Sequence, residues 1–349
     1  MAVGLGSGAY LAFVGMLFVS GNPVFKDRQS LLADIVSNSF TNASIPDMGV
    51  RYAFFPEADT SAKEGDGQLT LVFAGDIMLA RQIGNIMEEK NDWQHPFYYV
   101  RNIIADADIA FANLESVIAT TGTSVGSIYS FRADPRSLKG LSYAGFDVLS
   151  VANNHAWDYG PDALKESLLF LKSSGIDYVG GGFDYEEAHN PVIKEIDGTK
   201  IAYIGYTNLI PRGVTTQSSK PALAYLDLEQ TLLDIDHIQK EADIVIVSLH
   251  WGEEYQTHSN ELQQRIGRAL INAGANIIIG HHPHVPQEVE RYNGGYIAYS
   301  VGNLIFDQNF GEGTERGLVV RAIVEGDRVS ALEEIPVQFN LSFQPFVAE

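Results

Sequence analysis

Apolar and amphipathic stretches alternate along the chain from residue 69 onward. Short runs dense in Val, Ile, Leu and Phe predict buried strands over 69–74, 108–112, 147–151, 243–249, 276–279 and 296–300. Between these runs, amphipathic stretches predict helices over 81–90, 138–145, 161–174, 228–242 and 262–273. This alternation of strands and helices is typical of an α/β fold.

The middle and the end of this region are expected to be structural. Two strand-like runs, 192–196 and 200–205, flank Asp197-Gly198 and predict a hairpin. The run Gly180-Gly181-Gly182 predicts a turn and not a phosphate loop, because no Lys-Ser or Lys-Thr follows it. The last two runs, 317–324 and 329–337, predict antiparallel strands.

The N-terminal part has a different pattern. Residues 3–20 carry no charge and reach the lower limit of length for spanning a bilayer, which predicts a signal-anchor or transmembrane segment over 1–25. A secretory signal normally has a basic residue before its apolar run, whereas Lys26 follows this one, and a buried N-terminal helix is the alternative. Residues 26–68 read as a connector, and 69–349 as the functional domain.

Composition narrows the classes of partner and site. The net charge of −21 argues against nucleic acid as a partner, because phosphate backbones are bound by clustered Lys and Arg. The same acidity fits a protein that is soluble outside a cell. The chain has no cysteine, which excludes disulfides, thiolate zinc sites and cysteine nucleophiles. Any metal must therefore be held by nitrogen and oxygen atoms.

Polar residues follow the predicted strands at the points where the strands end. They are Asp76, Glu115, Asn154 with His155, His250, and His282 with His284. In α/β sheets, ligands bind in the crevice outside the carboxyl ends of the strands, where loops from several strands meet. A single Asp after a strand is usually a helix cap. Five sets of carboxylate, amide and imidazole groups instead predict a metal site.

The types of donor suggest the metal and the chemistry. Carboxylate, amide and imidazole donors without sulfur suit one or two ions of Mn²⁺, Fe²⁺ or Zn²⁺. Two ions about 3.5–4 Å apart would clamp an in-line displacement at phosphorus or carbonyl carbon. If Asn154 is a ligand, His155 is available to protonate the leaving group, with Asp158 holding its ring. The alternative is that His155 to Asp158 only cap the following helix.

Six segments resemble, in order, the serial motifs of the CapA family. This family comprises poly-γ-glutamate capsule biosynthesis proteins and is related to the calcineurin-like metallophosphoesterases. The segments are GDIMLAR (75–81), NLE (113–115), ANNHAWDYG (152–160), HWGEEY (250–255), GHHPHV (280–285) and SVGN (300–303). Each motif alone is weak, but six in sequence from about residue 69 to 307 are specific.

The resemblance implies a four-layer αββα sandwich with a metal site at the edge of its two sheets. It matches Asp76 to the aspartate of the first motif, and Glu115 to the aspartate that bridges two metals. The remaining matches are Asn154 and His155 for the Asn-His pair, His250 for the single histidine, and His282 with His284 for the last pair.

Two departures from the wider superfamily bear on the metal site. Met78 stands where the first motif has a histidine, and a thioether is a poor ligand for these ions. Glu115 is one methylene longer than the usual aspartate. His281 is an additional histidine that is either a compensating ligand or a residue that lies behind the ligands or faces solvent; we favour the latter, because adjacent residues of an extended chain point opposite ways. Arg81 is predicted to bind an anionic substrate group, with a helix salt bridge as the alternative.

The N-terminal apolar segment predicts an extracytoplasmic protein that is membrane-anchored, with secretion as the alternative. The resemblance implies a role in the synthesis or export of poly-γ-glutamate or a related anionic polymer. The expected activity of the protein is metal-dependent hydrolysis of a phosphoester. Its expected partners are an anionic polymer or phosphoester substrate and a membrane synthase complex. The alternative is a non-catalytic scaffold that keeps the fold and binds polymer or synthase partners; Met78 favours this alternative, whereas Asn154, His155 and His250 favour the enzyme.

Overall fold

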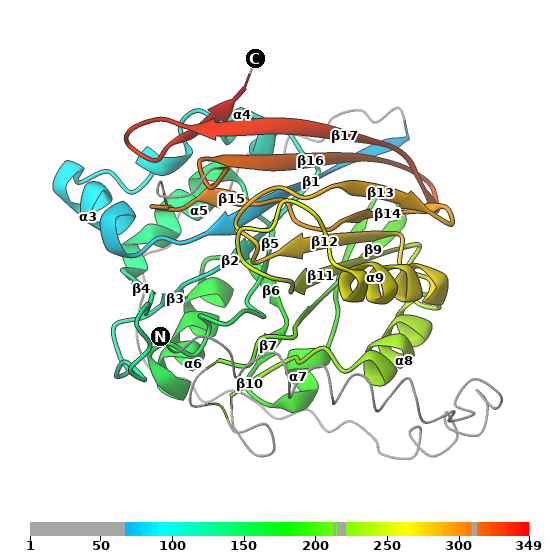
Figure 1. Cartoon of the computed structure of the whole chain (residues 1–349), viewed down its shortest axis with the longest axis horizontal. Coiled ribbons are helices and arrows are strands. Elements are labelled where there is room, and N and C mark those ends of the chain that lie inside the picture. Colours follow the sequence, from blue (N-terminus) through cyan, green and yellow to red (C-terminus); the bar gives the residue numbers. More distant parts are fainter. Residues whose placement is uncertain (1–66, 212–213, 215–220, 309–312, 349) are drawn as a thin grey trace, which may run out of the picture. The chain divides into compact units, whose positions relative to one another are not determined.

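A computed structural model describes residues 67–211, 214, 221–308 and 313–348 (Figure 1). The predicted segment 1–25 and the connector up to residue 66 lie outside the described residues. Within the described ranges, none of the helices combines the length and the apolarity needed to cross a bilayer.

The first sheet forms around β1 (Gln68–Ile77), which is the first strand expected from the sequence. Its order is β18 (Pro345–Val347), β17 (Arg328–Phe339), β16 (Arg316–Glu325), β1, β2 (Ile109–Leu114), β5 (Val148–Ser150) and β6 (Asp177–Val179), and β15 (Asn303–Ile305) also pairs with β1. The four strands β1, β2, β5 and β6 are parallel, so their carboxyl ends lie along one edge. The predicted antiparallel pair at the end of the chain is confirmed as β16 and β17.

The second sheet repeats this arrangement with a parallel centre. Its order is β13 (Val289–Tyr292), β14 (Gly295–Ala298), β12 (Ile277–His281), β11 (Ile244–His250), β9 (Thr199–Thr207) and β8 (Val192–Ile196). Strands β9, β11, β12 and β14 are parallel, and only the edge strands β8 and β13 run the other way. The predicted hairpin is confirmed as β8 and β9, with Asp197 and Gly198 both at positive φ, as a tight two-residue turn requires.

The two sheets pack face to face. Alternate residues of β1 and β2 face a cluster that also contains alternate residues of β9, β11 and β12. Phe111 of the first sheet stacks on Tyr203 of the second, with ring centroids 5.7 Å apart. Full burial of each such side chain contributes about 1.5–3 kcal/mol to folding. This shared core fixes the two sheets against one another and so aligns their carboxyl edges.

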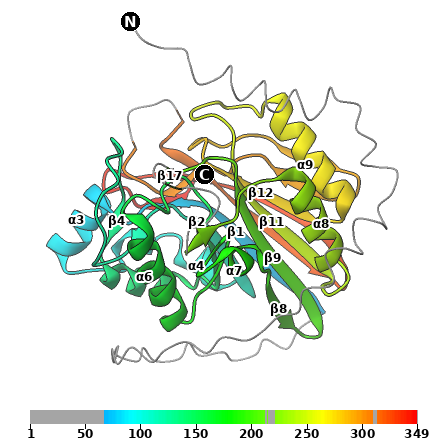
Figure 2. The same ribbon diagram turned by 90° about the horizontal axis from the view of Figure 1, so that it is seen from below.

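Helices cover the outer face of each sheet (Figure 2). The outer face of the first sheet packs on α3 (Arg81–Lys90), α5 (Leu138–Ala144) and α6 (Gly160–Ser173), and that of the second on α8 (Leu228–Ile238) and α9 (Glu261–Ala273). Shorter helices are α4 (Arg101–Ala105) and α7 (Tyr185–His189). The layers are therefore helix, sheet, sheet and helix, which confirms the expected αββα sandwich.

Local signals explain where several helices begin and end. Gly145 ends α5 in the left-handed region, at φ 91°, as predicted. Asn260 starts α9 with a capping box, because its side chain accepts the N–H of Gln263 and the Gln263 side chain accepts the N–H of Asn260. Helix α8 ends at Ile238, four residues before the predicted end.

The glycine run at 180–182 corrects the sequence analysis. Only Gly180 has a positive φ, whereas Gly181 and Gly182 form the short strand β7 (Gly181–Gly182). This strand pairs with β10 (Ala222–Leu223), and a second small pair joins β3 (Val117–Ile118) to β4 (Arg132–Ala133). The predicted turn is wrong for two of the three glycines, which lie in a strand pairing. A Cβ would meet the Val151 side chain at Gly181 and the backbone of Ala188 at Gly182, so close packing, and not a turn, favours glycine at both positions.

Candidate metal centre

Strand ends from both sheets meet at one place. In the first sheet Asp76 of β1 lies opposite Asn113 of β2, and in the second His250 of β11 lies opposite His281 of β12. Ligand atoms of Asp76, Glu115 and His250 all lie within 4.8 Å of one another, and all three residues are buried. The structure thus brings together predicted donors that are up to 174 positions apart, from 76 to 250.

Asp76 is the centre of this group. Its Oδ1 accepts a hydrogen bond from Asn113 Nδ2 at 2.9 Å and lies 3.0 Å from Nδ1 of His281. Its Oδ2 accepts the backbone N–H of His282 at 3.2 Å. His281 is fully buried, so a solvent-facing position for this histidine is wrong. The ring contacts Asp76 because β12 extends two residues beyond the predicted end at 279 and ends at His281.

The second pair of predicted histidines lies beside Glu254. His284 Nε2 is 3.6 Å from Glu115 Oε1, and its Nδ1 is 3.0 Å from Oδ1 of Asn303. Ligand atoms of Glu254, His282 and His284 lie within 4.8 Å of one another. The sequence analysis missed Glu254, although it stands in the HWGEEY motif. Its spacing from a strand end gave no reason to prefer it over Glu253.

His155 and Asp158 form a hydrogen-bonded pair at the edge of the group. His155 Nδ1 lies 2.8 Å from Asp158 Oδ2, which also accepts the backbone N–H of Phe131 at 2.7 Å. The His155 ring packs on Phe131, with centroids 4.1 Å apart, and its Nε2 lies 3.8 Å from Glu115 Oε1. The helix-cap alternative is wrong for Asp158, because Tyr159 precedes α6 and no side chain caps that helix.

Buried asparagines hold the loops of the site. Asn154 Oδ1 lies 2.8 Å from Nε2 of His250, so these two predicted donors converge. Asn153 donates to Asn113 Oδ1 and to the Leu114 carbonyl, and its own Oδ1 accepts the N–H of His155. Asn113 donates to both Asp76 and Glu115. Neither Asn113 nor Asn153 was predicted as a site residue; an amide in an otherwise apolar strand was the available signal for Asn113.

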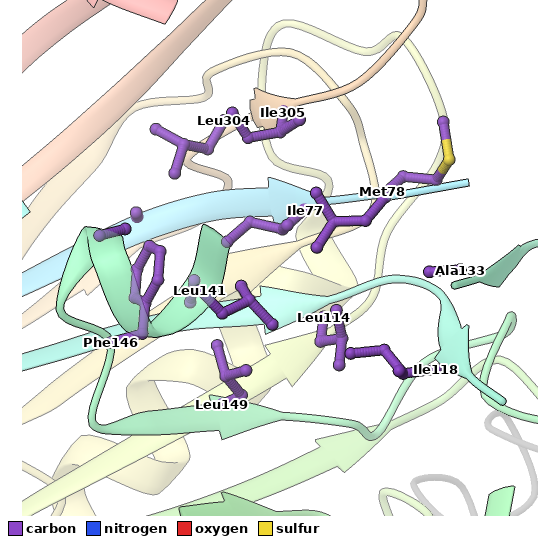
Figure 3. Packing of buried hydrophobic residues seen from close by; sticks show 14 of the residues in the cluster. Ile77, Met78, Leu114, Ile118, Ala133, Leu141, Phe146, Leu149, Leu304 and Ile305 are labelled. Atoms are coloured by element: carbon purple, nitrogen blue, oxygen red, sulfur yellow. The ribbon is translucent and has the colours of Figure 1, made fainter. Parts of the chain in front are cut away.

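Met78 lies in the hydrophobic core. It is fully buried and belongs to the cluster that contains Ile77, Leu114 and Ile305 (Figure 3). Its sulfur accepts the backbone N–H of Ala80 at 3.2 Å. The residue that departs from the superfamily motif therefore serves packing and the turn into α3.

Arg81 is paired with Asp307. Its Nε donates to Asp307 at 3.0 Å, and its Nη2 also contacts that buried carboxylate. The guanidinium stacks over Phe131, at 5.0 Å from the ring centroid. The salt-bridge alternative thus describes this geometry, with a partner from beyond β15 and not from the helix itself. Binding of an anionic substrate by Arg81 stays a prediction.

The electrostatics of the buried donors fit a divalent cation. Burial raises the pKa of the Glu115 carboxyl well above its usual range, and the nearby Asp76 carboxylate adds to the effect. Burial lowers the pKa of His250 well below its usual value and that of His282 to about 3, so both imidazoles are neutral near pH 7. Neutral imidazoles are the form that ligates metals, and a divalent cation between the two carboxyl groups would offset the burial and the like charge that raise the Glu115 pKa.

Three buried atoms of the group also have no hydrogen-bond partner within the described ranges. They are Glu115 Oε1, His281 Nε2 and His282 Nδ1. Each unsatisfied buried group costs about 1–3 kcal/mol. In addition, His282 and His284 have φ values of 96° and 59°, and such conformations cost about 1–3 kcal/mol each in non-glycine residues. Bound metal would give partners to the donors of Glu115 and His282, which belong to the two groups of candidate ligands, and so offset part of this cost. The donor set therefore fits the predicted cofactor.

Gly280 sets the path of the chain into the histidines. A Cβ at this position would lie 1.9 Å from the Tyr299 carbonyl oxygen, which accepts the Trp251 Nε1–H at 2.9 Å. We expect Gly280→Ala to lower the free energy of unfolding by about 3 kcal/mol, because backbone must move to admit the methyl group. Urea unfolding measures this change. Gly84→Ala in α3 is the control, since its nearest contact is at 3.2 Å and alanine favours helix; equal midpoints for the two variants would contradict the prediction.

Comparison with known proteins places these motifs in one family. The family profile described as "Bacterial capsule synthesis protein PGA_cap" matches residues 70–308, more than half of the 349 residues. The chain is 34% identical to PGA biosynthesis protein CapA of Bacillus subtilis (strain 168), over 73% of this chain and 67% of that protein. It is 31% identical to Capsule biosynthesis protein CapA of Bacillus anthracis, over 78% and 68%. A solved structure, calcineurin-like phosphoesterase YfkN from Bacillus subtilis, matches at 14% identity and a TM-score of 0.46, over 77% of this chain and 90% of that one. The resemblance inferred from the six motifs is therefore confirmed, and the chain belongs to the bacterial capsule synthesis protein PGA_cap family.

Proposed function

We propose that this protein is a metal-dependent hydrolase of a phosphoester that acts in the synthesis or export of poly-γ-glutamate or a related anionic polymer. The observation that carries the proposal is the group of buried donors, Asp76, Glu115 and His250, within 4.8 Å of one another. A polar cluster with unsatisfied atoms is costly to bury without a ligand, and its donor types suit Mn²⁺, Fe²⁺ or Zn²⁺.

The chain's own residues divide into holding and proton-transfer roles. Asp76, Glu115, Asn154 and His250 would hold one ion, and His282 and His284 would contribute to a second. Bound divalent ions supply Lewis-acid polarisation of the phosphoryl group. Asn113 and Asn153 keep the carboxylates and the His155 loop in place through the hydrogen bonds described above.

His155 is the proposed general acid. In this role the His155 Nδ1–H group donates a hydrogen bond to the Asp158 carboxylate, which leaves Nε2 on the Glu115 side of the site. An imidazolium in this position donates its Nε2 proton to the leaving-group oxygen and returns to the neutral form. The Asp158 carboxylate, held by the Phe131 N–H, stabilises the imidazolium and fixes its ring.

The process is inferred from the family and from its named members. The relatives carry the names PGA biosynthesis protein and Capsule biosynthesis protein. For this chain we infer a site of action at the extracytoplasmic face of the membrane, with residues 1–25 as the anchor, and association with a membrane synthase complex. The net charge of −21 repels an anionic polymer from the general surface, so contact with polymer would be confined to the site.

A non-catalytic scaffold is the second candidate, and Met78 favours it. Because the Met78 side chain is packed in the core, it contributes no nitrogen or oxygen donor to the site. A scaffold of this kind would keep the fold, bind polymer or synthase partners, and show no turnover.

Metal content and hydrolysis separate the two candidates. We expect the purified chain to retain at least one Mn, Fe or Zn ion after gel filtration and to hydrolyse an aryl phosphodiester. Removal of metal by a chelator is expected to abolish the rate, and added Mn²⁺ to restore it, because the ions supply the Lewis-acid polarisation of the phosphoryl group. Elemental analysis and aryl-phenolate release measure the two quantities. Tight metal binding without any turnover would support the scaffold, and absence of both would contradict a metal centre.

A further inference from the structure

We infer that Glu254 is a ligand of a second divalent ion, together with His282 and His284. This inference rests on the proposed function and extends it to a residue outside the donor set predicted from the strand ends. Ligand atoms of the three residues lie within 4.8 Å of one another, as do those of the separate group Asp76, Glu115 and His250. One carboxylate and two imidazoles form an ordinary ligand set for Zn²⁺, Mn²⁺ or Fe²⁺.

Backbone contacts fix Glu254 beside the two histidines. Two loops carry the three residues, one after β11 and the other after β12. The Trp251 N–H donates to the His281 carbonyl at 3.1 Å, and the Tyr255 N–H donates to the Pro283 carbonyl at 2.8 Å. These bonds lie on both sides of Glu254 and tie its loop to the 281–284 segment. The backbone of Glu254 is therefore held beside the two histidines by the fold.

Independent features of the histidines point to a ligand at this position. His282 is only 6% exposed, and its buried Nδ1 has no hydrogen-bond partner within the described residues. Tyr255, His282 and His284 all have positive φ, and strain of this kind collects at ligand-binding sites. An ion held between the two loops would account for the positive φ of the three residues and for the unpaired ring nitrogen of His282.

The two groups differ in exposure, which predicts two ions of unequal affinity. Asp76, Glu115 and His250 are buried, whereas Glu254 is exposed. An ion held partly by an exposed carboxylate competes with water for its ligand and is screened by salt. We therefore expect the Glu254 ion to exchange first when metal is limiting, and the buried group to retain its ion.

Metal stoichiometry tests this inference without reference to activity. Metal-free full-length protein is titrated with Mn²⁺ by isothermal calorimetry, and bound metal is counted after gel filtration, for the wild type, Glu254→Gln and Glu253→Gln. Glu253 is the matched control, because it is an exposed neighbour with the same charge and is not in the group. We expect two ions in the wild type and in Glu253→Gln, and one in Glu254→Gln, with the weaker site weakened at least about tenfold.

Other outcomes separate this inference from the proposed function. Two ions in both variants would overturn the role of Glu254 while leaving the metal-dependent hydrolase intact. One bound ion in the wild type and one in Glu254→Gln would also overturn the role of Glu254. A wild-type chain that binds no Mn²⁺, Fe²⁺ or Zn²⁺ would contradict the proposed function itself, and the assignment of Glu254 with it.

Discussion

Replacement of His155 by alanine is expected to lower kcat for an aryl phosphodiester with a poor leaving group by about 10²–10⁴-fold, the usual contribution of a positioned general acid. The metal content should stay at the wild-type value, because His155 lies beside the donor group and its Nδ1 is engaged by Asp158. Steady-state kinetics together with elemental analysis measure both quantities. The decrease should be smaller for a nitrophenolate leaving group, which departs without a proton.

Two further variants make this result specific. Asp158→Asn keeps a side-chain oxygen for the Phe131 N–H but removes the charge that stabilises the imidazolium, so an intermediate loss of rate is expected. His258→Ala removes an exposed histidine whose ring nitrogen lies 3.1 Å from the Thr257 hydroxyl, and it should leave the rate unchanged. An unaltered rate in His155→Ala, with wild-type metal content, would exclude His155 as the general acid.

The strand ends could be predicted from the sequence because a strand leaves a strong local signal. A run such as 244–249 is apolar at every position except Ser248, which identifies a strand buried on both faces. The charged or imidazole residue that follows such a run marks the edge where ligands bind. This reasoning placed Asp76, Glu115 and His250 at the same edge, and their atoms do lie together. The αββα order of the four layers was predicted from the resemblance carried by the six motifs, because hydrophobic periodicity alone indicates only an α/β fold.

The contacts between loops could not be predicted in this way. Arg81 pairs with Asp307, 226 positions away, and nothing near either residue indicates the other. Glu253 and Glu254 are adjacent acidic residues in the sequence, and only the fold brings Glu254, and not Glu253, next to His282 and His284. The sequence places Asn113 in a motif at the end of a strand but does not indicate that its amide donates to the two carboxylates of Asp76 and Glu115. Each of these contacts depends on where strands that are distant in the sequence end relative to one another.

Substitution of Asn113 by aspartate is expected to destabilise the metal-free protein by about 3–5 kcal/mol near pH 8. Asn113 is fully buried, and its Nδ2 donates to Asp76 at 2.9 Å and to Glu115 at 3.2 Å. The substitution removes both donors and places a third carboxyl against two others, where burial and like charge raise its pKa. A buried acid with a raised pKa binds a proton that the unfolded chain has lost. The charge-dependent part of the cost is therefore small below about pH 4 and increases as the pH rises.

Urea unfolding at pH 5.5 and pH 8, with and without Mn²⁺, tests this expectation. The loss of stability should be larger at pH 8 and should shrink when Mn²⁺ is saturating, because a divalent charge among the carboxylates offsets their repulsion and binds only the folded state. Asn102→Asp on the exposed face of α4 is the matched control and should change stability by less than about 0.5 kcal/mol at either pH. A loss in Asn113→Asp that is the same at both pH values and insensitive to Mn²⁺ would attribute the effect to the missing hydrogen bonds alone, and would contradict a site whose carboxylates are arranged to share a cation.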